Sequence, residues 1–260
     1  MNRSLLIIML LILLGCASQT EFEEVKMIHK IEYPQLPGWV YELPAGEYVI
    51  GIARKSFDED EMKDAAKQMA AVMKSRNEAS YSIEKFASTT TEDLLRDGKA
   101  EFRLNVSASP ETTRRLYESL QVIDEVFFFD YYLALFSLQK DNVTEKYKKR
   151  FVANFPDWYK KDKISVESSQ IISYATGSSF NLVNAWESAA ENARLEIAKY
   201  VEKDVQTALI SKDEEMEKSL ALETTKKLIE MKLRRCFISS ELKDNLRSYK
   251  VLMEMVIKNK

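Results

Sequence analysis

The stretch LPGW at residues 36–39 opens a sequence pattern that the chain repeats. It is followed by the apolar segment YVIGIA at residues 48–53. FPDW at residues 155–158 opens the second copy, and the apolar segment IISYAT follows at residues 171–176. Short apolar runs that contain β-branched residues and tyrosine favour strands. The repeat therefore predicts two copies of one structural unit.

A helix is predicted after each of these strands. In both copies a Ser-Phe pair, at residues 56–57 and 179–180, precedes a segment in which alanines recur at helical spacing. Such alanines form a narrow stripe that lets a helix lie close to a sheet. The first helix should begin near Asp58, and the second should span about residues 181–208. The alanines that share this spacing are Ala66, Ala70, Ala185, Ala189 and Ala193.

Four consecutive acidic residues, 58–61, stand where the first helix should begin. Negative charge is favourable there because the helix dipole is positive at its N-terminus. A Ca²⁺ loop of the EF-hand type needs spaced oxygen ligands and a central glycine instead. We therefore predict that these acids stabilise the start of a helix.

The two copies also end alike. ETTRRL at residues 111–116 matches ETTKKL at residues 223–228, and each copy closes on an apolar segment, 131–138 or 249–257. The expected order in each copy is strand, long helix, further strand or helix, and final strand. A further helix is expected at about residues 213–233.

The aromatic run FFFDYY at residues 127–132 allows two interpretations. The preferred one is a strand that is buried on both faces. The alternative is an exposed aromatic platform for a ligand or a partner.

These patterns give the predicted domain boundaries. The first domain is placed at residues 36–140 and the second at residues 155–260, with a linker at residues 141–154. The linker holds the basic run KYKKR at residues 146–150, which we interpret as a solvated segment rather than a binding patch.

The N-terminus predicts a lipid anchor. Arg3 precedes ten consecutive apolar residues, 5–14, which is too short for a membrane-spanning helix of about 20 residues. It fits the apolar region of a signal peptide at residues 1–15. The run ends in LLGC, which resembles the bacterial lipobox and predicts that Cys16 is acylated after cleavage. The alternative is an ordinary signal peptide with a chance cysteine.

Residues 16–35 follow as a polar tether. The residue after the cysteine is Ala17 rather than Asp, which favours the outer membrane over the inner membrane. The expected location is therefore the cell envelope, anchored to the outer membrane by lipid.

Composition excludes several classes of function. The chain of 260 residues has 38 Lys and Arg against 41 Asp and Glu, so a dedicated nucleic-acid binder is not expected. One histidine, His29, and two cysteines leave too few ligands for a zinc site, and we predict no metal and no cofactor. Cys236 follows two arginines, which would favour a reactive thiol, but we expect it to be half-buried and inert. A disulfide with a second molecule is the third alternative.

No catalytic residue is predicted. The sequence lacks a nucleophile elbow, a P-loop and a dinucleotide fingerprint, and His29 lies in the tether, outside any pocket. The acidic pair Asp124 and Glu125, before the aromatic run, is the strongest catalytic candidate, but we do not expect it to be catalytic. The protein is expected not to be an enzyme.

The two copies together resemble the LPP20-like family of bacterial lipoproteins. The resemblance implies an α+β fold of two tandem domains, each with a long helix packed on a small antiparallel sheet. The second copy departs from the pattern at Tyr174, which stands opposite Gly51 when the Ser-Phe pairs are aligned. The residues that carry the resemblance are Pro37, Trp39, Gly51, Ala53, Ala66, Ala70, Tyr132, Leu135, Pro156, Trp158, Ala189, Ala193, Tyr249 and Leu252.

Family members are envelope lipoproteins, and some relatives are associated with flagellar assembly or the cell surface. The resemblance therefore implies a non-enzymatic scaffold or docking protein whose partner is an envelope or flagellar protein. The alternative is a lipoprotein that binds a glycan or a small ligand through exposed aromatic residues. Trp39 and Trp158 are the candidates for such a partner or ligand surface.

Overall fold

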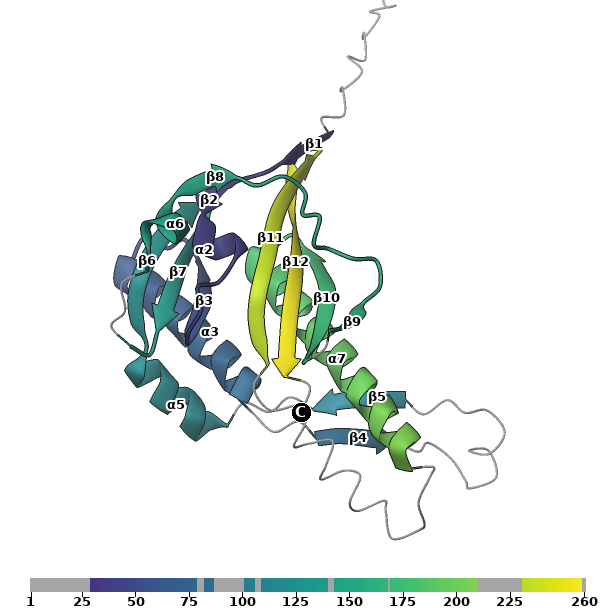
Figure 1. Ribbon diagram of the computed structural model, residues 1–260. Helices are drawn as coiled ribbons and strands as arrows, with labels where there is room; N and C mark the ends of the chain where they lie inside the picture. Colours follow the sequence, from purple (N-terminus) through teal and green to yellow (C-terminus); the bar gives the residue numbers. More distant parts are fainter. Residues whose placement is uncertain are drawn as a thin grey trace, which may run out of the picture.

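The computed structural model describes residues 29–78, 82–86, 101–105, 109–139, 143–167, 169–209 and 231–258. Figure 1 shows two sheets side by side, with helices packed against them. The predicted signal peptide, Cys16 and the repeat ETTKKL at residues 223–228 lie outside the described residues. So does most of the helix predicted at 213–233; its last residue, Leu233, belongs to a strand.

The larger sheet has five antiparallel strands. Its two longest strands form a hairpin in which Lys243 pairs with Leu246 across the turn. The first described residues of the chain, before the first sequence copy, form its edge strand and pair with the long hairpin. The strand order is β1 (His29–Glu32), β11 (Lys232–Lys243), β12 (Leu246–Lys258), β10 (Gln170–Ser179) and β9 (Ile164–Glu167).

The smaller sheet has three antiparallel strands in the order β3 (Tyr48–Arg54), β7 (Tyr131–Ser137) and β6 (Gln121–Phe128). Every residue of β7 is buried, because this strand lies in the middle of the sheet and under a helix. That helix is α3 (Glu59–Glu78), and α5 (Pro110–Ser119) packs against α3 rather than on the sheet.

The two long helices begin where the sequence predicts. The carboxylate of Asp58 accepts hydrogen bonds from the backbone N–H groups of Asp60 and Glu61, which caps α3 as expected for a short polar side chain. The side chain of Asn181 caps α7 (Leu182–Leu209) in the same way, through the N–H groups of Val183 and Asn184. Both predicted helix starts are confirmed. α7 lies on β10 and β12 of the larger sheet.

Glycines let these helices approach their strands. A Cβ added to Gly51 would lie 2.1 Å from the carbonyl oxygen of Ala66, and one added to Gly177 would lie 2.1 Å from that of Ala185. The two glycines therefore have the same role in the two sheets. The alignment that placed Tyr174 opposite Gly51 is wrong by three residues, because Gly177 is the residue that meets the helix.

Short elements join the two sheets. β2 (Gln35–Pro37) pairs with β8 (Arg150–Val152), and α2 (Gly38–Tyr41) contacts both β11 and α6 (Glu145–Lys148). A separate pair consists of β4 (Ser82–Phe86) and β5 (Glu101–Asn105). Within the part of the chain that is described, no helix is long and apolar enough to cross a membrane.

The predicted fold of two tandem domains, each with one long helix on a small antiparallel sheet, is wrong. The two main sheets have five and three strands, and the larger one includes β1, which comes from the predicted tether. The opening at residues 36–39 forms parts of β2 and α2, whereas residues 155–158 form neither helix nor strand. The buried side chains form one hydrophobic cluster that spans both sheets. The apolar pattern did not indicate that both copies share one core.

The aromatic run at residues 127–132 is also not a continuous strand. β6 ends at Phe128, Phe129 turns with a φ of 50°, and β7 begins at Tyr131. Phe127 and Phe129 are exposed, while Phe128, Tyr131 and Tyr132 are buried. The prediction of a strand buried on both faces is therefore wrong, since the chain reverses direction within the run.

Candidate functional site

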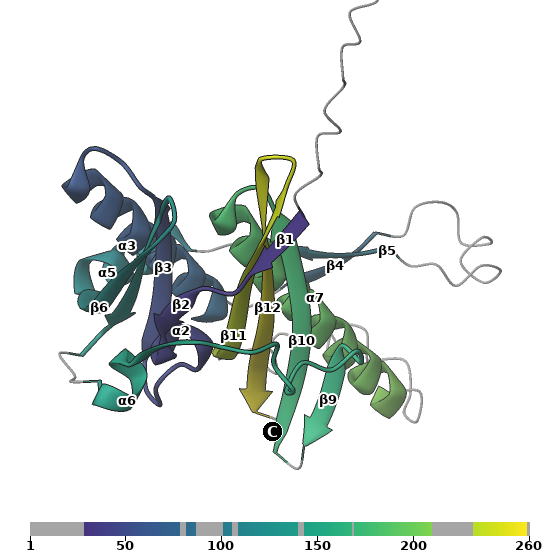
Figure 2. The ribbon, with the colours of Figure 1, turned by 90° about the horizontal axis from the view of Figure 1, so that it is seen from above.

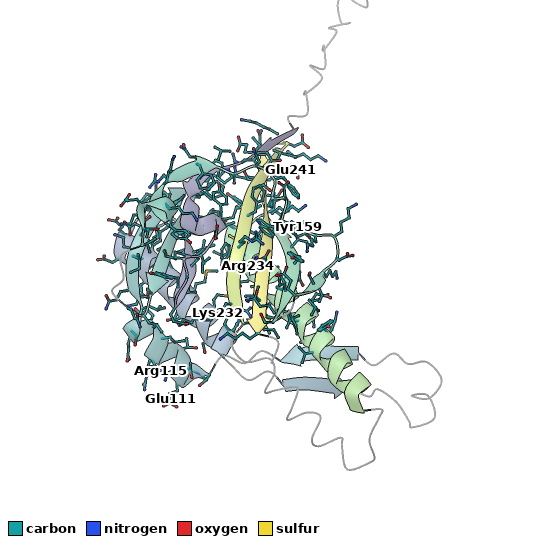
Figure 3. The ribbon with its side chains drawn as sticks, viewed as in Figure 1. Glu111, Arg115, Tyr159, Lys232, Arg234 and Glu241 are labelled. Atoms are coloured by element: carbon teal, nitrogen blue, oxygen red, sulfur yellow. The ribbon has the colours of Figure 1, made fainter. Side chains whose placement is uncertain are left out.

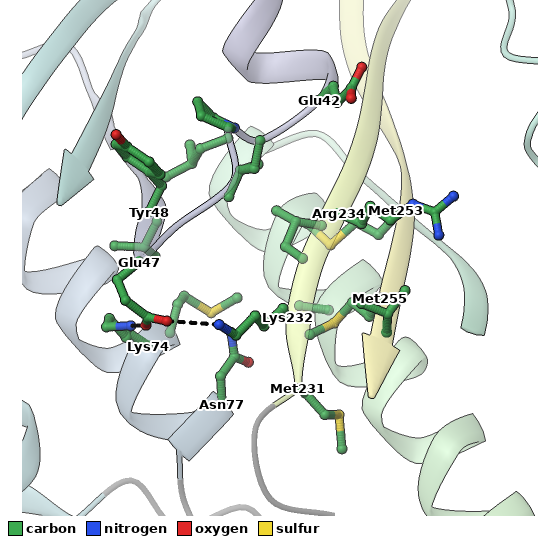
Figure 4. Close-up of a pocket in the computed structure, with 18 of the residues that line it drawn as sticks. Glu42, Glu47, Tyr48, Lys74, Asn77, Met231, Lys232, Arg234, Met253 and Met255 are labelled. Carbon is green, nitrogen blue, oxygen red and sulfur yellow. Dashed lines mark hydrogen bonds and ion pairs between the residues drawn. The ribbon is translucent and has the colours of Figure 1, made fainter. Parts of the chain in front are cut away.

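A cavity of about 590 Å³ lies between the two sheets. The loop of residues 42–47 and the start of β3 form one side (Figure 4). Side chains from α3, α7, β11 and β12, together with Tyr147 of α6, form the rest. Cavities of this volume accommodate small organic ligands. No part of the sequence pattern indicated this cavity, because its walls come from six separate segments of the chain.

The apolar part of the cavity wall is rich in methionine. Met73 comes from α3, Met253 and Met255 come from β12, and Trp186 comes from α7. Methionine side chains are flexible and polarisable, so they adapt to ligands of irregular shape. This part of the wall suits a chain or ring without polar groups.

The polar part of the wall is centred on Glu47. Its carboxylate accepts hydrogen bonds from Lys74 Nζ at 2.6 Å and from Lys232 Nζ at 2.7 Å (Figure 4). These bonds, first that of Lys232 and then that of Lys74, lower the pKa of Glu47 to about 2. The ion pairs join the loop to α3 on one side and to β11 on the other.

Arg194 is a second charged group of the wall, and its side chain is fully buried on α7. Its guanidinium donates to Asn77 Oδ1 at 2.7 and 3.2 Å and to Glu191 Oε1 at 2.9 Å. Glu191 also accepts a hydrogen bond from Arg76 of α3 at 3.0 Å. A buried charge needs such partners to offset its loss of hydration. This network therefore fixes α7 against α3.

Arg234 lies two residues after Lys232 on β11 (Figure 3). It also borders the cavity. It pairs with the fully buried carboxylate of Glu254 at 2.7 Å, and Arg235 pairs with the same carboxylate at 2.7 Å. Both arginines that precede Cys236 are thus engaged by Glu254.

Cys236 is buried, and its Sγ lies 2.6 Å from the carbonyl oxygen of Val40, to which the thiol donates. Burial raises the pKa of the thiol above its usual range. The thiol is thus more deeply buried than the expected half-buried cysteine, and its raised pKa favours an unreactive sulfur.

The structure separates the two tryptophans that were predicted to form a partner or ligand surface. Trp39 has no exposed surface, and its Nε1 donates to Asp124 Oδ2 at 2.8 Å. Trp158 is half-buried, with the guanidinium of Arg235 5.4 Å from its ring centroid. Trp39 is therefore a core residue, and Trp158 is the one that retains access to solvent.

The acidic pair before the aromatic run has structural partners. Asp124 holds Trp39, and Glu125 accepts a hydrogen bond from Tyr132 Oη at 2.6 Å. Burial, followed by the bond to Glu125, raises the pKa of Tyr132 above its usual range. These contacts give each of the two acids a partner within the fold. His29 lies in β1, where its backbone pairs with Lys243.

A group of exposed apolar side chains was not predicted. We call Tyr33, Phe151 and Phe155 the aromatic patch; their exposed fractions are 43, 41 and 54%. Tyr33 and Phe155 both contact the buried ring of Phe237, at centroid distances of 5.8 and 5.9 Å. The patch was missed because its residues lie in the predicted tether, in the predicted linker and at the start of the second copy.

In the ranges that the structure covers, no three His, Cys, Asp or Glu side chains are grouped so that they could hold a metal ion. No family model matches the chain. No curated protein is significantly similar to it, and no solved structure is either. The resemblance to the LPP20-like family thus remains a prediction from the residues that carry it.

Proposed function

We propose that this protein is a cell-envelope lipoprotein, anchored to the outer membrane through lipid on Cys16, that serves as a non-enzymatic docking protein. The aromatic patch is the observation that carries the docking role. In this patch Tyr33 and Phe155 are exposed on either side of the buried ring of Phe237. Clusters of exposed apolar side chains are typical of sites where another protein binds. The partner would be another envelope component, such as a protein of flagellar or surface assembly.

The arrangement of charges supports a structural rather than a chemical use of the interior. Glu47, Arg194 and Glu254 are each held by oppositely charged or amide side chains. An active site usually contains a nucleophile or a general base whose reactive atom remains accessible to the substrate. In this cavity the contacts of Glu47 join α3 to β11, those of Arg194 join α7 to α3, and those of Glu254 join β12 to β11.

Site-specific photo-crosslinking in living cells tests the docking role. A photoreactive phenylalanine analogue would replace Phe155 in the aromatic patch, and a matched variant would carry it at Arg114, an exposed position on α5. We expect a discrete crosslinked envelope protein from position 155 and none from position 114. The adduct should disappear in the Cys16→Ser variant if membrane anchoring brings the partners together. Equal crosslinking at both positions would contradict the proposal.

The cavity supports a second candidate function, the binding of a small anionic amphiphile such as a fatty acid. Its methionine-rich wall would hold the apolar chain, and Lys74 and Lys232 would hold the carboxylate in competition with Glu47. This candidate replaces a ligand surface on Trp39, which is buried.

Energy transfer from Trp186 to a polyene fatty acid tests this second candidate, because Trp186 lines the cavity. Lys232→Met should weaken binding about tenfold, the effect of losing one charge-assisted hydrogen bond. The control is Lys163→Met, since Lys163 pairs with Glu196 at 3.1 Å away from the cavity lining. Equal binding by the two variants would rule out the cavity as the site.

A further inference from the structure

Five large apolar side chains are exposed at one edge of the molecule, and we call this group the apolar edge. Phe57 is fully exposed, and Phe180 is 70% exposed. These two residues precede α3 and α7, respectively, and the others lie at or near the turns of the two long hairpins. The members of the apolar edge are Phe57, Phe127, Phe129, Phe180 and Leu246.

Contacts among neighbouring residues place this group together. The backbone N–H of Lys55 donates to the carbonyl of Asp130 at 2.6 Å, so the chain before Phe57 meets the β6–β7 turn. Tyr131 Oη accepts from the N–H of Leu182 at 3.1 Å, and its ring lies 5.2 Å from that of Tyr249. The start of α7 and the β11–β12 hairpin therefore meet the same turn.

The N-terminal part of the chain enters the fold at this edge as well. In β1, His29 pairs with Lys243, the last residue of β11 before the hairpin turn. Figure 2 shows the β6–β7 turn, the β11–β12 turn and the start of β1 along one side of the molecule. A chain held at Cys16 is thus attached to the protein on the side where the apolar residues are exposed.

We propose that the apolar edge lies on the surface of the phospholipid bilayer to which the protein is anchored. This inference rests on the proposed lipid anchor at Cys16. Thirteen residue steps separate Cys16 from His29, which limits their separation to about 45 Å even for a fully extended chain. The short connection between Cys16 and His29 keeps the apolar edge at a high effective concentration near the membrane. Weak apolar contacts are therefore sufficient to hold the edge on the bilayer surface.

The chemistry of the edge fits the boundary between headgroups and acyl chains. Lys55 Nζ lies 5.7 Å from the ring centroid of Phe127, and the Arg247 guanidinium lies 3.7 Å from that of Phe129. Aromatic rings accompanied by cations are typical of this boundary. Asp130 and Asp244 lie in the same turns, so the contact is carried by apolar insertion rather than by net charge.

The fold supplies a matched control at the opposite end of β10. Gln170 begins β10 and pairs with Glu167, whereas Phe180 follows the last residue of the same strand. Ten strand residues span about 30 Å. Val166 lies at the far end and is also apolar and exposed, at 48%.

The test uses the full chain, purified from bacterial membranes and reconstituted into vesicles of phosphatidylethanolamine and phosphatidylglycerol. Phe180→Cys and Val166→Cys would each carry an environment-sensitive fluorophore, and nitroxide-labelled lipids would quench it. Both positions are exposed, so neither substitution disturbs packing. We expect several-fold stronger quenching at 180 than at 166, with no loss at high salt because the contact is apolar.

Flotation of the same vesicles distinguishes a wrong orientation of the protein from the absence of the lipid anchor. If the protein floats and both labels are quenched equally, the proposed orientation is wrong while the anchor stands. If the wild-type chain does not float, or if Cys16 reacts with the thiol label, the anchor itself fails and this inference fails with it. Buried Cys236 should not contribute to the labelling of the folded chain.

Discussion

Glu47 and Lys232 are 185 residues apart in the sequence, yet Lys232 Nζ donates to Glu47 Oε1 at 2.7 Å. The same carboxylate accepts from Lys74 at 2.6 Å, so one acidic residue joins α3, a loop and β11. The contact closes the polar side of the cavity. Because both lysines lower the pKa of Glu47 to about 2, the contact also gives the fold a dependence on pH.

Glu47→Gln should lower the free energy of unfolding at neutral pH by about 1 kcal/mol, since the pairs are partly solvated. The lowered pKa means that the ionised carboxylate stabilises the folded state. This contribution is complete above the reference pKa of 4.5 and is lost as the pH falls towards 2. Denaturant unfolding at several pH values should show the loss in the wild type but not in the variant. Glu118→Gln on the exposed side of α5 is the control, and an equal effect there would contradict this assignment.

Gly51→Ala and Gly177→Ala should each destabilise the fold by about 3 kcal/mol, at the upper end of overpacking effects. The new methyl group would lie 2.1 Å from a helix carbonyl in both cases, so helix and strand would have to separate. Thermal unfolding monitored by circular dichroism measures the change. Ser178→Ala, next to Gly177 but exposed, should be nearly neutral. Equal stability of Gly177→Ala and Ser178→Ala would show that the helix does not lie this close to the strand.

Acrylamide should quench the fluorescence of the folded chain only in part, and Trp158→Phe should abolish most of that quenching. Trp39 and Trp186 are buried, whereas Trp158 is half-buried beside Arg235. Stern–Volmer plots of the two proteins give the comparison. Strong quenching that persists in the Trp158→Phe variant would mean that Trp39 or Trp186 is accessible.

Cys236 should not react with a thiol reagent in the folded protein and should react fully after denaturation. Burial raises the pKa of the thiol, and Arg234 and Arg235 are directed to Glu254 instead of the sulfur. The rate of reaction with a chromogenic disulfide, followed with and without denaturant, measures this protection. Glu254→Gln should increase the rate only as far as it destabilises the fold. A fast reaction in the native wild type would show that the thiol is exposed.

Local features were predictable because they depend on neighbouring residues. Asp58 and Asn181 cap helices through N–H groups two or three residues ahead, so their sequence position was sufficient. The strands at residues 48–53, 171–176 and 249–257 were predicted from their apolar composition, and β3, β10 and β12 contain them. Composition could not reveal the turn at Phe129, because phenylalanine in a left-handed conformation is set by the hairpin around it.

The candidate sites depend on contacts across the fold. Nothing near Glu47 in the sequence indicates that Lys74 and Lys232 will share its carboxylate. Tyr33 and Phe155 belong to segments that looked like a tether and a domain start, yet both contact Phe237. Trp39 was a candidate for a partner or ligand surface, but its side chain is buried and its Nε1 donates to Asp124.

The sequence alone determined the short-range structure: the helix starts at Asp58 and Asn181 and the apolar strands that precede them. The lipid anchor at Cys16 is a prediction from the same kind of local pattern. Only the tertiary structure decided that β1 joins the larger sheet, that both sheets share one core, and that a cavity lies between them. The physical reason is the separation in sequence over which each effect acts. Capping and periodicity depend on residues a few positions apart, whereas burial depends on which segments, far apart in the sequence, pack together.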